Sequence, residues 1–72
     1  MLTPSWHAKQ RIWERNLSDE AIAAALAGRV VEGVWETYHY DRATRVCVVS
    51  SGDRIVTAFK MRKAQVKRLL SR

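Results

Sequence analysis

The residue types change abruptly at Gly28, and this change limits the folds that the chain can adopt. The seven residues before it are mostly alanine, a strong helix former. The residues after it are rich in β-branched and aromatic types, which favour strands. A chain of 72 residues has room for a single domain, residues 1–72. Helices that come first and strands that follow indicate an α+β domain, with the helices packed on an antiparallel sheet.

The helix boundaries are marked by capping residues. Two N-terminal helices are expected, at about 4–15 and 18–27. Thr3 and Pro4 suit the start of the first helix. Asn16 tolerates the left-handed conformation that ends helices, while Ser18 and Gly28 suit the start and the end of the second.

One side of the first helix is apolar. Trp6, Trp13 and Leu17 fall within a narrow arc at about 100° per residue, and Ile12 widens it. We therefore expect the two tryptophans to face the core.

Three strands are expected, at about 30–40, 45–50 and 54–59. The links between them are short and rich in turn-forming residues, which predicts an antiparallel meander. Gly33 interrupts the first strand and suggests a β-bulge there. Residues 61–70 predict a short basic helix, with a frayed tail as the alternative.

The charge of the chain points to a polyanionic partner. Thirteen basic and seven acidic residues give a formal charge of +6, which favours nucleic acid ahead of a membrane surface. Cys47 is the one cysteine, so no internal disulfide can form, and its apolar neighbours indicate a core residue. No segment reads as a signal peptide or a membrane span, so we expect a cytoplasmic protein.

His7, Arg11 and Arg15 recur every four residues and form a polar stripe along one side of the first helix. A solvated helix face explains such a stripe, and so does a phosphate-handling site. Histidine titrates near neutrality, and the planar arginine fork donates two hydrogen bonds to a phosphate.

Two sequence patterns resemble known families. The order His7, Arg11, Arg15, Leu17, Ser18, then Gly28, Val30, Val31 and Glu32 resembles a widespread family of small domains of unknown function. The runs 40–49 and 55–60, the second reading Ile-Val-Thr-Ala-Phe-Lys, resemble a strand pair of bacterial polymorphic-toxin ribonucleases. Both resemblances imply the barnase, EndoU, colicin and RelE-like superfamily. The expected fold is therefore two N-terminal helices packed on a three- to four-stranded antiparallel sheet, with a short basic C-terminal helix.

The resemblance implies a metal-independent endoribonuclease toxin that cleaves RNA through a 2′,3′-cyclic phosphate, without a cofactor. His7 would be the acid or base, Arg11 and Arg15 would hold the phosphate, and Thr57 and Lys60 would assist. For Thr57 the alternative is an ordinary strand residue. An antitoxin or immunity protein, or a second copy of the chain, is the further partner expected of such a toxin.

Other residues are candidates for RNA contact. Tyr38 and Tyr40 should share one face of their strand, opposite His39, and either stack on bases or pack across strands. The tail from Lys60 to Arg72 has six basic residues and no acidic one, so it is a phosphate-binding strip or a solubilising end, and Val66, Leu69 and Leu70 offer a docking face. The full set is Lys9, Tyr38, His39, Tyr40, Arg62, Lys63, Lys67 and Arg68.

Two other functions fit the same sequence. One is a non-catalytic RNA- or DNA-binding module that uses the charge without turnover. The other is a basic protein-interaction module that meets an acidic partner. Neither a zinc nor a calcium site is expected, because the histidines, the cysteine and the carboxylates lack ligand spacing.

Overall fold

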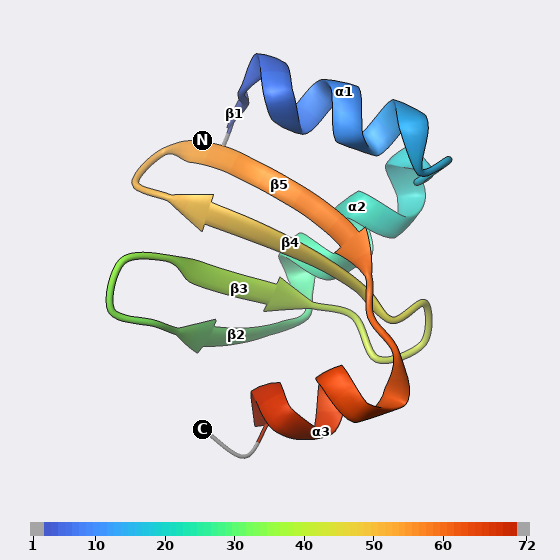
Figure 1. Ribbon diagram of the computed structural model, residues 1–72, viewed down its shortest axis with the longest axis vertical. Coiled ribbons are helices and arrows are strands. Elements are labelled where there is room, and N and C mark those ends of the chain that lie inside the picture. Colours follow the sequence, from blue (N-terminus) through green and yellow to red (C-terminus); the bar gives the residue numbers. More distant parts are fainter. Residues whose placement is uncertain (1–2, 71–72) are drawn as a thin grey trace.

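A mixed sheet and three short helices make up the computed structural model, which describes residues 3–70 (Figure 1). In chain order the elements are β1 (Thr3–Pro4), α1 (Trp6–Glu14), α2 (Asp19–Ala27), β2 (Arg29–Glu32), β3 (Thr37–Tyr40), β4 (Val46–Ser51), β5 (Arg54–Lys60) and α3 (Lys63–Leu70). Within these residues the sheet has five strands in the order β1-β5-β4-β3-β2.

The sheet corrects the expected fold of three to four antiparallel strands. Strands β2 to β5 are antiparallel neighbours, but β1 pairs with β5 in parallel, with Thr3 opposite Arg54 and Pro4 opposite Ile55. The segment expected to begin the first helix therefore adds a strand, and the sheet is mixed. A pair of bridged residues is too short to leave a pattern of alternation in the sequence.

The predicted strand at 30–40 is in fact two strands joined by a tight turn. The Gly33 N–H donates to the Glu36 carbonyl at 2.7 Å and closes this turn between β2 and β3. A Cβ at Gly33 would lie 2.9 Å from that same oxygen, so the close approach needs glycine. The expected bulge at Gly33 is thus a hairpin, and the register shift lies instead between β4 and β5, at Val49 and Ser50.

The ends of α1 and α2 are marked by the residues that the sequence predicts, except at the start of α1. The Ser5 hydroxyl, rather than Thr3, caps α1 by accepting from the Ala8 N–H at 3.1 Å. The Ser18 hydroxyl accepts from the Ala21 N–H at 3.1 Å, and Asn16 is left-handed with φ 53°, as predicted. These two features turn the chain sharply from α1 into α2.

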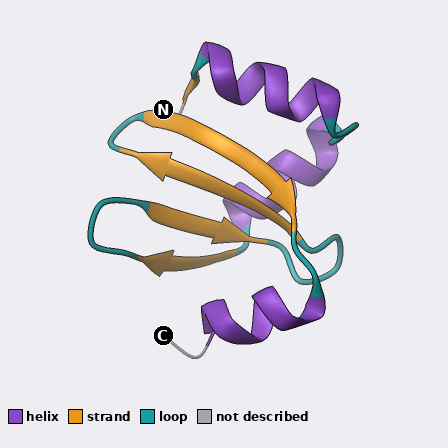
Figure 2. Cartoon of the chain, viewed as in Figure 1, coloured by secondary structure: helices purple, strands orange, loops and turns teal. Residues whose placement is uncertain are grey.

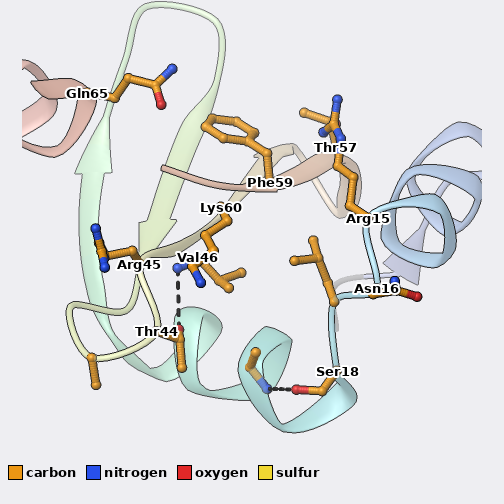
Figure 3. Close-up of a pocket in the computed structure, with 13 residues that line it drawn as sticks. Arg15, Asn16, Ser18, Thr44, Arg45, Val46, Thr57, Phe59, Lys60 and Gln65 are labelled. Atoms are coloured by element: carbon orange, nitrogen blue, oxygen red, sulfur yellow. Dashed lines mark hydrogen bonds between the residues drawn. The ribbon is translucent and has the colours of Figure 1, made fainter. Parts of the chain in front are cut away.

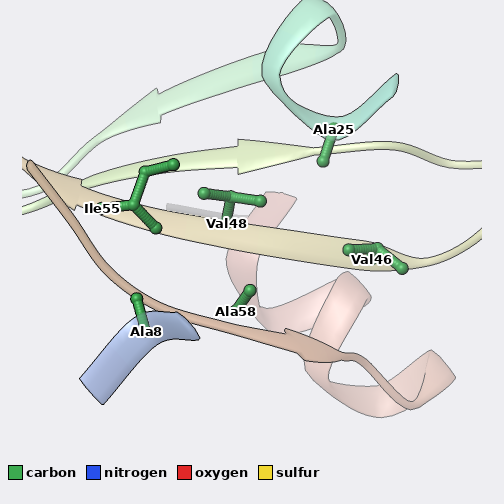
Figure 4. Close-up of a cluster of buried hydrophobic side chains, with 6 residues drawn as sticks. All are labelled: Ala8, Ala25, Val46, Val48, Ile55 and Ala58. Carbon is green, nitrogen blue, oxygen red and sulfur yellow. The ribbon is translucent and has the colours of Figure 1, made fainter. Parts of the chain in front are cut away.

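The orientation of α1 differs from the prediction. Trp6 and Trp13 are 76% and 80% exposed, while Ala8 is fully buried and Ile12 packs against the core. The core explains the difference, because α1 contacts the sheet through the small side chains of Ala8 and Ala58 (Figure 4). An indole in place of either methyl group would hold the helix away from the sheet.

The sheet has a cluster of buried side chains on each face. Ala8, Ala25, Val46, Val48, Ile55 and Ala58 lie between the sheet and the helices α1 and α2 (Figure 4). Tyr40, Cys47, Val49 and Met61 form the cluster on the opposite face. Most of the side chains in these two clusters are small, so each contributes little buried apolar surface.

Cys47 is fully buried, as expected for a core residue. Burial raises the pKa of its thiol to about 11, which keeps the sulfur protonated near neutral pH. Among residues 3–70, no helix combines the length and the apolarity that crossing a membrane requires.

Candidate functional site

A cleft of about 970 Å³ opens at the end of the sheet where β5 leads into α3. The α1–α2 turn, the β3–β4 loop and the β5–α3 link meet at this end (Figure 2). The lining residues are Arg15, Asn16, Leu17, Ser18, Ala21, Ala43, Thr44, Arg45, Val46, Thr57, Phe59, Lys60 and Gln65. Elements far apart in the sequence therefore build one site.

The outer edge of β5 forms the floor of the cleft. Strand β1 pairs only with Arg54 and Ile55, so beyond Ile55 this edge has no neighbouring strand among the described residues. Thr57, Phe59 and Lys60 come from this uncovered part of β5. Because side chains alternate along a strand, Lys60 lies opposite Val46 on the helix side, while Thr57 and Phe59 lie on the other side. The cleft thus follows the edge and takes side chains from both faces.

Arg15 joins α1 to this edge. It is the C-cap of α1, and its guanidinium donates to the Ala58 carbonyl at 2.8 Å. This bond satisfies a carbonyl that an edge strand would otherwise present to solvent. A guanidinium has five N–H donors, so the same side chain can also bind an anion in the cleft.

Arg45 enters the cleft from a loop that the Asp41 carboxylate fixes. This carboxylate accepts from the Thr44 hydroxyl at 2.7 Å and from the Thr44 N–H at 3.0 Å. The Thr44 hydroxyl, followed by the Thr44 N–H, lowers the pKa of Asp41, so the carboxylate stays ionised. Arg45 itself is left-handed, with φ 61°, a conformation that costs an L-residue about 1–2 kcal/mol.

Three cations from three different parts of the chain therefore line the cleft. Figure 3 shows Arg45 and Gln65 on one side of the cleft, Arg15 and Thr57 on the other, and Lys60 and Phe59 between them. The residues that line the cleft include no aspartate or glutamate. The three lining cations outnumber the ionised carboxylate of Asp41 in the adjoining loop, so the charge of the lining favours an anionic ligand.

The five residues expected to act in catalysis are divided by the fold. Arg15, Thr57 and Lys60 line the cleft. Arg11 instead pairs with Glu14 at 3.2 Å on the exposed side of α1. His7 is exposed two turns before Arg15, about 12 Å away along the helix axis, and is not among the lining residues.

The aromatic candidates lie elsewhere in the sheet. Tyr40 is buried and Tyr38 packs against the same cluster, which fits the cross-strand alternative rather than base stacking. His39 points to the other face, as the alternation predicts, where its Nε2 lies 2.9 Å from the Ser50 hydroxyl oxygen. Its Nδ1 is buried with no hydrogen-bond partner among the described residues. None of the three lines the cleft.

The basic tail continues from the cleft. Arg62 and Lys63 follow directly after β5, and the Arg62 N–H donates to the Gln65 side chain at 2.9 Å at the start of α3. Arg62, Lys63, Lys67 and Arg68 are exposed, and Lys9 is exposed on α1. The side chains of Val66, Leu69 and Leu70, and Arg72 as a whole, lie outside the described residues.

Comparison with family models, with curated proteins and with solved structures finds no match to this chain. The functional interpretation therefore depends on the chemistry of the cleft itself. Among residues 3–70, no group of three or more histidine, cysteine, aspartate or glutamate side chains is placed to hold a metal ion.

Ten of the thirteen lining residues were not site candidates from the sequence, and four of them matter most for the argument: Asn16, Arg45, Phe59 and Gln65. Arg45 had one usable signal, since it follows a turn-forming segment and turns often need a left-handed residue. The other three are brought to the cleft by the packing of α1, β5 and α3 around one edge, which no local pattern reveals.

Proposed function

We propose that this domain binds single-stranded RNA in the cleft at the free edge of β5, without turnover. The observation that carries the proposal is that Arg15, Arg45 and Lys60 all line one cleft whose lining has no carboxylate. Cations of this kind neutralise successive phosphates of a backbone. The half-buried Phe59 ring offers a flat surface for one base, as in other proteins that bind single strands.

Polar side chains of the cleft support RNA as the ligand. Thr57 has a hydroxyl group, and Asn16 and Gln65 have amide groups, all of which can exchange hydrogen bonds with a ribose 2′-hydroxyl. The 2′-hydroxyl is the group by which a protein distinguishes RNA from DNA. We therefore expect the domain to prefer RNA over a DNA strand of the same sequence.

An endoribonuclease remains the second candidate. Its support is the grouping of Arg15, Thr57 and Lys60, three of the residues that the family resemblance assigns to the reaction. Cleavage through a cyclic phosphate also needs a base for the 2′-hydroxyl and an acid for the leaving oxygen. The lining has no imidazole and no carboxylate, and His7 lies outside it, so binding without cleavage fits the geometry better.

One titration tests binding. Fluorescence anisotropy of a labelled oligouridylate, followed at several salt concentrations, gives the slope of log Kobs against log salt. The slope should decrease in magnitude by about 0.7 in Lys60→Gln, which removes one phosphate contact. The matched control is Arg54→Gln, which removes the same charge from the other end of β5 and should leave the slope unchanged.

The same protein, incubated with total RNA in excess EDTA, separates the candidate functions. Bound but intact RNA supports the proposal. Cleavage that survives EDTA and is lost in His7→Ala or Lys60→Gln would establish the ribonuclease instead. If no nucleic acid binds even at low salt, both readings are wrong and a basic protein-interaction module remains. For either RNA function we place the action in the cytoplasm, where the single thiol stays reduced and an antitoxin could cover the cleft.

A further inference from the structure

Two tryptophans on α1 lie in solvent on the side away from the sheet. Trp6 is 76% exposed and Trp13 is 80% exposed. They are seven residues apart, so they lie on the same side of the helix and about 10.5 Å apart along its axis. A packed indole contributes a large buried area, and neither ring has this contribution within the described fold. Two such rings on one helix side constitute a surface that suits a flat, apolar ligand.

The charge between the rings selects the kind of ligand. Lys9 and Gln10 occupy the third and fourth positions after Trp6, so they lie on the same side of the helix as the two rings. The first turn of α1 has no acidic residue, and the carboxylate of Glu14 is paired with Arg11. An apolar protein groove would have to desolvate the Lys9 ammonium, whereas a nucleic-acid strand supplies bases for the rings and phosphates for the lysine.

The position of α1 links this side to the cleft. Trp13 precedes Arg15 by two residues, and Arg15 is part of the cleft wall. Two residues of helix turn the side chain by about 200°, so Trp13 lies on the opposite side of α1 from Arg15. A strand that leaves the cleft at Arg15 would pass round the last turn of α1 to reach Trp13 and then continue toward Trp6. The axial separation of the two rings equals about three steps of 3.4 Å, the rise of one stacked nucleotide. The helix thus offers two stacking surfaces at a spacing that a single strand can match.

We propose that Trp6, Lys9 and Trp13 form a stacking platform for unpaired bases of the RNA that the cleft holds by charge. This inference rests on the proposed function and extends it, because the two rings add stacking contacts that do not depend on salt. Stacking accepts every base, so the platform increases affinity for single strands without imposing a sequence. A duplex, whose bases are already stacked, gains nothing from it.

The experiment compares the three tryptophans of the chain. Oligouridylate affinity should fall about tenfold in Trp6→Ala and in Trp13→Ala, the loss typical of one stacked base, with the salt slope unchanged. The matched control is Trp35→Ala. Trp35 is 86% exposed, in the hairpin between β2 and β3, and its removal should change affinity less than twofold. Because all three rings are exposed, circular dichroism should show the same fold in every variant.

Tryptophan fluorescence provides a second readout. In a Trp35→Phe background, oligouridylate should quench the two α1 tryptophans, and in a chain that keeps only Trp35 it should not. If the α1 variants bind like the wild type while Lys60→Gln is impaired, the platform is wrong and the cleft stands. If no variant and no wild-type protein binds, the proposed function itself fails. A fluorescence blue shift with phosphatidylserine vesicles, without quenching by oligouridylate, would assign the surface to a membrane and overturn the inference.

Discussion

Replacing Arg45 with glycine should make the domain more stable and a poorer RNA binder at the same time. Arg45 has φ 61°, where an L-residue pays about 1–2 kcal/mol and glycine pays nothing. Glycine also has a more flexible unfolded state, which offsets about 0.5–1 kcal/mol of the gain. The net expectation is a stabilisation of about 0.7 kcal/mol, or a rise in Tm of about 3–5 °C for a domain of this size.

The backbone contacts of the loop should survive this substitution. The Arg45 N–H donates to the Asp41 carbonyl at 2.8 Å, and the Arg45 carbonyl accepts from the Met61 N–H at 2.8 Å. Neither bond uses the side chain. What the variant loses is one of the three cations of the cleft, so its salt slope for oligouridylate should decrease in magnitude by about 0.7.

The control is Asn16→Gly, at the other left-handed residue of the cleft. Asn16 has φ 53° and no charge, so this variant should keep the salt slope and gain less stability, because asparagine tolerates the conformation. Thermal melts and anisotropy titrations on the three proteins give both quantities. An Arg45→Gly protein with the wild-type slope would show that Arg45 contacts no phosphate. A lower Tm would show that the loop is not strained.

Two further predictions concern the core. Because the pKa of Cys47 is raised to about 11, the unfolded state releases this proton first, and the contribution of the thiol to stability should be lost as pH rises from about 9 to about 11. Urea denaturation at pH 8 and pH 10 measures this loss of stability, and Cys47→Ala should lose less than the wild type. Equal losses in both proteins would contradict the raised pKa of Cys47. A Cβ at Gly28 would lie 2.3 Å from the Tyr40 carbonyl oxygen, whereas at Gly52 it would meet nothing within 4 Å. Urea denaturation should therefore show a free energy of unfolding that is lower by on the order of 2 kcal/mol in Gly28→Ala, because of the clash, and by about 1 kcal/mol in Gly52→Ala, because of left-handed strain. The reverse order would refute the packing at Gly28.

The local features of the fold could be predicted because each depends on neighbouring residues. Ser18 and Asn16 mark helix ends through their own hydrogen bonding and backbone preference, and both act as expected. The division of the first predicted strand at Gly33 could not be predicted in this way, because a glycine within β-formers suits a bulge and a turn equally. The outcome follows from the pairing of β3 with β2 on one side and with β4 on the other, which no local pattern reveals.

The orientation of α1 shows a different limit of the sequence. A hydrophobic arc predicts which side of a helix can be buried, but not how much room the core has for it. Here the sheet meets α1 at Ala58, and only the small Ala8 fits that contact. The residues of the cleft show the same limit. The predicted residues Arg15, Thr57 and Lys60 share a cleft, whereas the four-residue spacing that links His7 to Arg11 and Arg15 describes one helix and not the surface that it meets.

The pairing of β1 with β5 has a consequence for the order in which the domain assembles. It joins Thr3 and Pro4 to Arg54 and Ile55, across most of the chain. A ribosome releases β1 and α1 first, but α1 has its packing surface, including Ala58, only after β5 has emerged. The helix that provides Arg15 therefore docks in the same late step that completes β5 and its free edge. A nascent chain therefore cannot form the proposed RNA-binding cleft until β5 has emerged and paired with both β4 and β1.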